Sequence, residues 1–149
     1  MDSLRIDSGV KRLMINDDPE NFIEFNPKDI VFAEKFYKLM SEFKTKLTEY
    51  EVLANQLDKE KEVDELNIPV NAGKQFELLK EACGYVREKI DYLFGADTSQ
   101  KVFGDLLSME AFAQFFEGIL PYIQTARSEK VDKYANKPRG TSAKRKVMS

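Results

Sequence analysis

With no histidine among its 149 residues, the side chains of this chain that most often do acid–base chemistry in enzymes are its carboxylates. Histidine is the usual general base near neutral pH and the commonest metal ligand, so its absence excludes histidine-dependent hydrolases and most zinc sites. The carboxylates gather at Asp17-Asp18, Glu60-Lys61-Glu62 and Asp64-Glu65. Acidic residues in such polar segments serve solubility more often than catalysis. We therefore expect no catalytic residue and no enzyme, and a carboxylate-only site assembled across helices is the one catalytic alternative left open.

The single cysteine, Cys83, cannot form an intramolecular disulfide, and without histidine it has no partner for a catalytic thiolate of the usual kind. It falls on the apolar stripe of a predicted helix, which predicts a small buried apolar residue. The sequence also contains no glycine-rich phosphate loop and no Cys or His cluster with metal-binding spacing. We expect neither a cofactor nor a metal.

The net charge of −3 is distributed unevenly along the chain. Five of the 23 basic residues and none of the 26 acidic residues lie in residues 137–149, which leaves residues 1–136 with 18 basic against 26 acidic residues. An acidic body repels a phosphate backbone, so we expect no specific nucleic-acid recognition. Residues 137–149 are predicted to be a disordered, solvated basic tail.

The elements that must position any functional side chain begin with three short β-type runs at residues 4–6, 10–15 and 22–25. Turn-forming clusters separate them, which predicts a small hairpin or a three-stranded meander. Strands this short are marginal alone. We expect them to pack on a helix or to pair with another chain.

A long amphipathic helix is predicted next, with Asn26 as its cap, Pro27 in the first position and Asp29 near the positive end of the helix dipole. From Ile30 to Leu57 the apolar residues recur at steps of three or four, which places the helix end near residue 60. A coiled-coil seam is the alternative. Intramolecular packing is favoured, because the stripe mixes bulky aromatic residues with alanine over only about four heptads.

Pro69 predicts a linker over residues 59–71, after which Asn71 is expected to cap a second helix that Gly95 ends. The apolar spacing predicts a buried face for this helix. Its members are Phe76, Leu79, Cys83, Val86, Ile90 and Leu93.

The last helical part is predicted to begin with a short helix over residues 99–103, which Gly104 interrupts. Ser108 is a suitable cap for the final helix, and Pro121 within that helix predicts a kink. The fold class is therefore mainly α: a small helical bundle (residues 26–136), with a short N-terminal β-hairpin or meander (residues 1–25) and the basic tail (residues 137–149).

The final helix carries an aromatic-rich stretch from residue 109 to residue 123. Phenylalanines at helical spacing usually form a core. However, Phe115 and Phe116 are adjacent and point about 100° apart, so they make an apolar arc wider than one neighbour needs. Core packing is favoured, and binding of a partner protein is the alternative. The candidate partner-binding residues are Phe112, Phe115, Phe116, Ile119 and Tyr122.

Four segments carry a resemblance to a known family. They are Phe25-Asn26-Pro27-x-Asp29, Phe94-Gly95-x-x-Thr98-Ser99-Gln100-Lys101-x-Phe103-Gly104, Phe112-x-x-Phe115-Phe116-Glu117-Gly118-x-x-Pro121 and Ala126-Arg127-x-Glu129-Lys130-Val131-x-Lys133-Tyr134. Over most of residues 25–134 the chain resembles the tail assembly chaperones of long-tailed phages and prophages of Gram-positive bacteria.

The resemblance implies a non-enzymatic helical protein of the host cytoplasm that keeps the tape-measure protein soluble and helps tail-tube subunits polymerise around it. The implied partners are the tape-measure protein and the tail-tube protein, and a homo-oligomer is compatible with this role. No apolar run approaches the ~20 residues that span a bilayer, so no membrane partner is expected. In comparable phage systems a ribosomal frameshift appends a second domain, and an A-rich coding stretch for Lys144-Arg145-Lys146 would suit such a junction.

Two other classes of function remain open from the sequence. One is a structural virion component such as a tail completion protein, which would be found in finished particles. The other is a regulator that inhibits a host protein through its acidic body.

Overall fold

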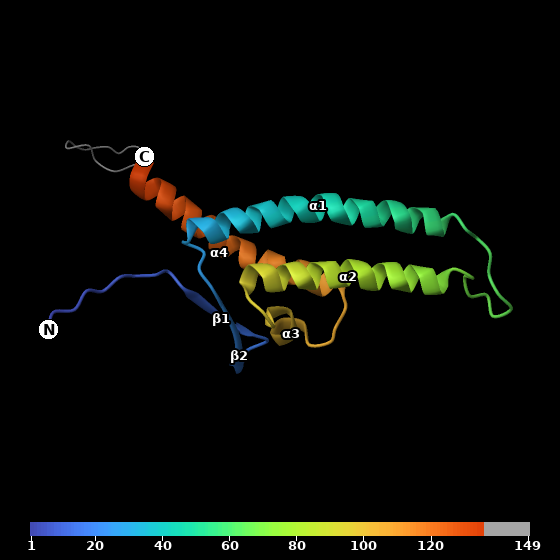
Figure 1. Cartoon of the computed structure of the whole chain (residues 1–149), viewed down its shortest axis with the longest axis horizontal. Helices are drawn as coiled ribbons and strands as arrows, with labels where there is room; N and C mark the ends of the chain where they lie inside the picture. Colours follow the sequence, from blue (N-terminus) through green and yellow to red (C-terminus); the bar gives the residue numbers. More distant parts are fainter. Residues whose placement is uncertain (136–149) are drawn as a thin grey trace.

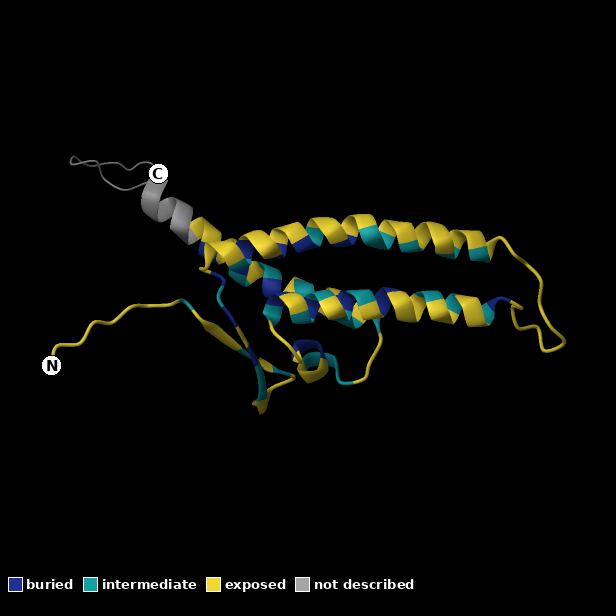
Figure 2. Cartoon of the chain, in the orientation of Figure 1, coloured by how far each residue is buried: buried dark blue, intermediate teal, exposed yellow. Residues whose placement is uncertain are grey.

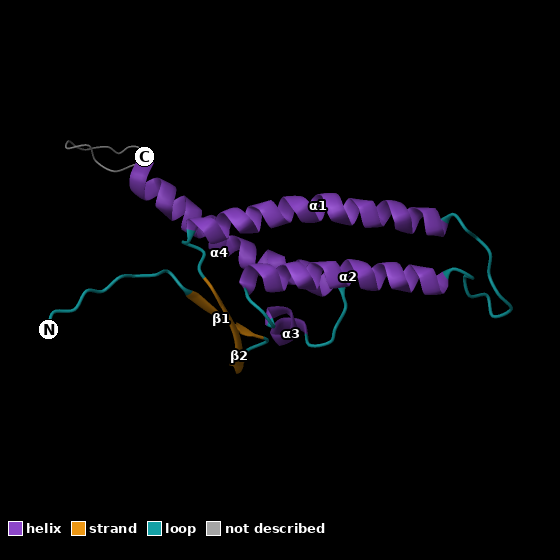
Figure 3. Cartoon of the chain, viewed as in Figure 1, coloured by secondary structure: helices purple, strands orange, loops and turns teal. Residues whose placement is uncertain are grey.

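The computed structural model describes the backbone of residues 1–135 and the side chains of residues 1–128. It confirms the predicted fold class, which is mainly α with a two-stranded antiparallel hairpin at the N-terminus (Figure 3). The prediction for residues 137–149 lies outside the described residues. In chain order the elements are β1 (Lys11–Ile15), β2 (Asp18–Phe25), α1 (Ile30–Asp58), α2 (Ala72–Phe94), α3 (Thr98–Phe103) and α4 (Met109–Ala135) (Figure 1).

The hairpin turns at Asn16 and Asp17, which have φ values of 53° and 61°. Asparagine and aspartate tolerate this left-handed conformation better than other residues with a β-carbon, so they suit a two-residue hairpin turn. Leu13 pairs with Ile23, and Lys11 pairs with Phe25. Of the three predicted strands two are present, and residues 4–6 form no strand.

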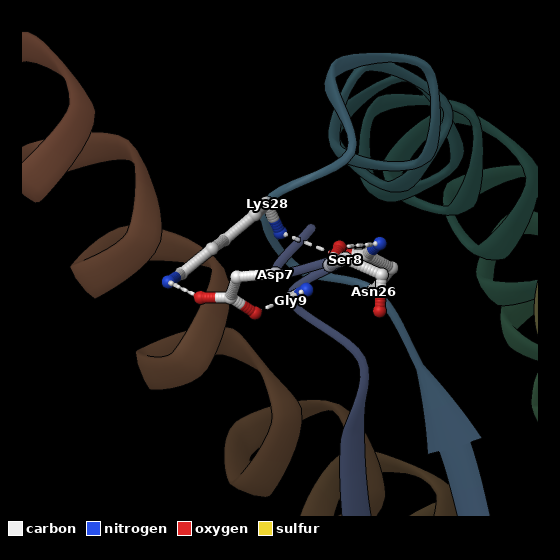
Figure 4. A network of polar contacts seen from close by, with 5 residues as sticks. All are labelled: Asp7, Ser8, Gly9, Asn26 and Lys28. Atoms are coloured by element: carbon white, nitrogen blue, oxygen red, sulfur yellow. Dashed lines mark hydrogen bonds and ion pairs between the residues drawn. The ribbon is translucent and has the colours of Figure 1, made fainter. Parts of the chain in front are cut away.

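A polar network explains why the segment before β1 does not continue the sheet (Figure 4). Asn26 Nδ2 donates to the Ser8 carbonyl, and Lys28 Nζ lies 3.6 Å from Asp7 Oδ2, so this segment is tied to the chain that follows β2. Gly9 has φ +83°, and a β-carbon there would lie 2.9 Å from Asn26 Oδ1. The turn therefore requires glycine and directs residues 1–8 away from the hairpin.

The predicted cap of α1 is wrong. Asp29 caps the helix, since its Oδ1 accepts from Val31 N at 2.9 Å, and the helix begins at Ile30. Asn26 Oδ1 instead accepts from Lys28 N at 3.1 Å. Two capping residues stand three positions apart, and the network around Ser8 engages the first of them, which leaves the second at the helix start.

The linker between α1 and α2 is confirmed, with an isolated bridge between Val63 and Pro69. Asn71 occupies the position before α2 but makes no side-chain capping bond. Its Nδ2 donates to Leu57 O at 2.7 Å and to Glu60 Oε2 at 3.0 Å. This buried side chain therefore ties the end of α1 to the beginning of α2.

The other predicted helix boundaries agree with the structure. α2 ends at Gly95 (φ +116°), and α3 ends before Gly104. Ser108 Oγ accepts from Ala111 N at 3.2 Å at the beginning of α4. α4 runs continuously through Pro121, and the kink at this residue stays a prediction.

The core lies where α1, α2 and α4 meet, with the hairpin packed against one end of it. Its largest fully buried side chains are Phe36, Phe112, Ile90, Ile123 and Val86. α4 does not cover the whole length of the α1–α2 pair, whose loop end projects past α3 (Figure 1). The part of α1 and α2 near their connecting loop is therefore a two-helix arm.

This limited cover makes two predicted core positions of α2 wrong. Phe76 is 65% exposed and Leu79 is 52% exposed, whereas Cys83, Val86, Ile90 and Leu93 are buried as predicted. The chain enters α4 beside Arg87, whose Nη1 donates to Leu106 O at 3.0 Å. Phe76 and Leu79 lie two to three helical turns before Arg87, beyond the start of α4.

We predict that Phe36→Ala lowers the free energy of unfolding by about 3–5 kcal/mol, because it removes a fully buried ring from the core. The matched variant Phe76→Ala removes the same ring from an exposed position and should change it by no more than about 0.5 kcal/mol. Urea titrations of both variants measure the difference. Equal losses would contradict this account of which part of α2 is covered.

Cys83 is buried, and burial raises the pKa of its thiol while the nearby Arg87 lowers it to a smaller extent. A raised thiol pKa stabilises the folded state below the unfolded pKa, and this stability is lost as pH rises through the folded pKa. At neutral pH we expect the folded chain to resist iodoacetamide and the urea-unfolded chain to gain one adduct, as measured by mass spectrometry. Equal labelling rates with and without urea would show that the thiol is accessible.

Candidate functional site

The aromatic stretch of α4 is divided between two sides of the helix. Phe112 and Ile119 are 1% and 2% exposed, and Phe115 is also buried. The Phe112 ring stacks edge-on against Phe103 of α3 at 4.8 Å between centroids, and Phe115 packs on Phe94 of α2 at 5.2 Å. In the folded chain these side chains make core contacts, which is the interpretation that the sequence favoured.

Phe116 packs on the other neighbour of α4. Its ring centroid lies 5.2 Å from that of Phe43 and 6.3 Å from that of Phe36, both in α1. The arc of adjacent aromatic residues is wide because α4 lies against two neighbours and needs a side chain for each. Phe116 is therefore half-buried at the α1–α4 contact, and its ring does not form the surplus surface that the arc suggested.

A groove of about 580 Å³ lies between the hairpin, α3 and α4. Three of the five predicted partner-binding residues line it: Phe115, Ile119 and Tyr122. Phe112 and Phe116 do not. The hairpin and α3 supply lining residues that sequence reasoning missed, namely Leu13, Met14, Ile15, Ile23, Val102 and Phe103.

The groove has an uncharged lining. Its polar groups are Asn16, Gln114 and the Tyr122 hydroxyl, and the rest of its side chains are apolar. Met14 and Leu106 of this lining remain exposed although they are large and apolar. With neither an acid nor a base in its wall, the groove suits the burial of a partner's apolar side chains.

Polar contacts hold α3 in place as one wall of the groove. Asp91 Oδ1 accepts from Ser99 N at 2.7 Å, and its Oδ2 accepts from Ser99 Oγ at 3.0 Å. On the side of the hairpin, Asn21 Nδ2 donates to Lys101 O at 2.7 Å. α3 has only six residues, and such a short helix depends on these tertiary bonds.

The hairpin is held by aromatic packing. Phe25, at the end of β2, contacts Phe32 at 5.9 Å, Phe94 at 5.8 Å and Tyr122 at 6.1 Å between ring centroids. At the beginning of β1, Lys11 Nζ lies 5.1 Å from the centre of the Tyr122 ring. The short β-type runs at residues 10–15 and 22–25 predicted the hairpin, but they did not indicate which helices it would cover.

Comparison with known proteins finds one family whose sequence profile matches residues 20–149, the greater part of the chain. The chain belongs to DUF6673, a family of unknown function. The matched range contains α1 to α4 and most of β2, so both walls of the groove on α3 and α4 lie within it. Neither the search of curated proteins nor the search of solved structures finds a match.

Two further searches of the described residues bear on the kind of site. No group of three or more His, Cys, Asp or Glu side chains in them could hold a metal ion. None of their helices is long and apolar enough to cross a membrane.

We predict that Asp91→Ala lowers the free energy of unfolding by about 1–3 kcal/mol, because it leaves the buried backbone N–H and hydroxyl of Ser99 without their acceptor. Asp105→Ala is the matched control, since Asp105 makes one long, exposed bond with Gln100 at 3.4 Å. It should change stability by no more than about 0.5 kcal/mol. Urea titration gives both values, and an undiminished stability of Asp91→Ala would show that α3 is held without this carboxylate.

Proposed function

We propose that this protein is a non-enzymatic phage tail assembly chaperone that binds the tape-measure protein and assists assembly of the tail tube. The observation that carries the proposal is the uncharged, apolar groove between the hairpin, α3 and α4. The resemblance of the Phe25, Phe94 and Phe112 segments to such chaperones names the client.

The chemistry of the groove fits a client helix. An amphipathic helix places apolar side chains at i, i+3, i+4 and i+7 along one face, and such a face docks into hydrophobic grooves on helical proteins. Exposed Met14 and Leu106 would meet this face first. Met14 adds an unbranched, adaptable side chain, which suits a groove that must accept successive segments of a long client.

The charge of the chain supports the same role. Residues 1–136 carry 18 basic against 26 acidic residues, so the body of the molecule is strongly acidic. A chaperone that covers an aggregation-prone helix must keep the complex soluble, and excess negative charge outside the groove does this. The tail-tube protein is the second partner that the resemblance implies.

The test is co-purification of the chain with the tape-measure protein of the same gene cluster, comparing two leucine variants. Leu106 lines the groove and is 53% exposed, whereas Leu66 lies in the α1–α2 loop and is 78% exposed. We expect Leu106→Asp to reduce binding at least about tenfold, because it buries a charge against apolar client side chains. Leu66→Asp should bind like the unmodified chain.

Circular dichroism on both variants establishes that they are folded. If folded Leu106→Asp binds the client normally, the groove is not the binding site. If the unmodified chain binds neither the tape-measure protein nor the tail-tube protein, the chaperone role itself is wrong. Stoichiometric amounts of the chain in purified virions would instead support a structural virion component.

A further inference from the structure

One side of the α1–α2 pair packs on α4, and the opposite side forms a long face that points away from α4. Lys35 and Tyr37 are two residues apart on α1 and therefore point about 200° apart around the helix. Tyr37 lies under Arg127 of α4, with 5.5 Å between the guanidinium carbon and the ring centre, whereas Lys35 lies over Tyr92 of α2 at 5.6 Å. The Lys35 side of the pair is thus the side that α4 leaves open.

The half of this face nearest the start of α1 is basic and aromatic. Lys89 Nζ lies 5.8 Å from the ring centre of Tyr85 and 5.7 Å from that of Tyr92, and Lys46 Nζ lies 5.9 Å from that of Tyr85. Together with Lys35, three ammonium groups therefore cover two tyrosine rings. We call this patch the basic half.

The half of the face nearest the α1–α2 loop is apolar and acidic. A groove of about 350 Å³ runs between the two helices there, and Leu53, Leu57 and Leu78 form its floor. Its charged residues are three acids and one base, namely Glu60, Glu77, Glu81 and Lys74. We call this patch the acidic half.

Helical spacing places both halves on one face. On α2, residues 78, 81, 85, 89 and 92 follow one another at steps of three or four, so the acidic half continues directly into the basic half. On α1 the junction is marked by the ion pair between Lys46 and Glu49, at 3.6 Å. Within residues 1–135 no helix or strand packs over this face, and exposed residues follow both helices along their length (Figure 2).

The face also carries acids in its basic half. Glu42 lies there one turn from Lys46, and Glu88 is adjacent to Lys89 in the sequence. They lower the positive charge of that half without reversing it, since Lys35, Lys38, Lys46 and Lys89 outnumber them. The face is therefore polarised along the helix axes, positive near the start of α1 and negative near the loop.

We propose that two copies of this chain associate through this face, with their α1–α2 pairs antiparallel. A two-fold axis near the level of Lys46 and Glu49 sets the basic half of each copy on the acidic half of the other, so each favourable contact occurs twice. A parallel arrangement would place like charges together. The leucine floor of one copy then lies against the tyrosine rings of its partner, in a four-helix bundle of the usual antiparallel kind.

The charge pattern favours a second copy over an unrelated partner. A basic amphipathic helix from another protein would complement the acidic half alone. It would leave the lysines of the basic half without acidic partners. A second copy matches both halves at once. The client groove lies on the side of α4 and the hairpin, so this association goes beyond the proposed function and does not rest on it.

The experiment is a charge reversal in two pairs, measured by sedimentation equilibrium of the chain alone over a series of concentrations. Lys35→Glu with Lys89→Glu makes both halves acidic, and Glu77→Lys with Glu81→Lys makes both halves basic. Each pair of substitutions should raise the dissociation constant of the dimer at least about tenfold, because like charges then repel across the interface.

The variant with all four reversals is the decisive control. Its net charge equals that of the unmodified chain, and its face is polarised in the opposite sense, so it should regain self-association. Circular dichroism establishes folding of every variant, and the chain is tested without a client, so the outcome is independent of client binding.

The unmodified chain should approach twice the monomer mass as its concentration rises. A monomer at every concentration overturns the proposal. An oligomer that neither pair of reversals weakens, or that the fourfold variant fails to restore, places the interface elsewhere and overturns it as well.

Discussion

Phe115 and Phe116 are adjacent on α4, and the packing of the three long helices depends on the different directions of their two rings. Phe116 packs on Phe36 and Phe43 of α1, while Phe115 packs on Phe94 of α2 and Phe103 of α3. α4 therefore packs against both α1 and α2, and the three long helices share one core. The hairpin covers one end of this core, where Phe25 packs on Phe94 and Tyr122.

The extent of α4 divides the surface into regions with different chemistry. Where α4 covers the α1–α2 pair, the polar bonds of Asp91 and Arg87 attach α3 and the segment before α4, and these segments complete the apolar groove with the hairpin. On the side that α4 leaves open, α1 and α2 expose Leu53, Tyr92 and charged residues. A single packing arrangement thus produces an uncharged groove on one side and a polarised face on the other.

The sequence predicted the order of the elements well, because the signals for them are local. Glycines 95 and 104, Pro69 and Ser108 act on the two or three residues beside them, and each marks a boundary that the structure has. The prediction of the α1 cap failed where two local signals competed. Asn26 and Asp29 both suit a helix cap, and the contact of Asn26 with Ser8, eighteen residues earlier, decided between them.

Periodicity by itself determined which residues share a helix face, and composition determined that catalytic histidine chemistry is absent. Periodicity could not determine how far a neighbouring helix extends along that face. Phe76 and Leu79 therefore fit the same pattern as Val86 and Ile90, yet they are exposed. It also could not assign Phe115 to the groove and Phe116 to the α1 contact. Only the tertiary structure decided these points, because burial depends on which segments distant in the chain lie opposite a side chain, and spacing along one helix carries no information about them.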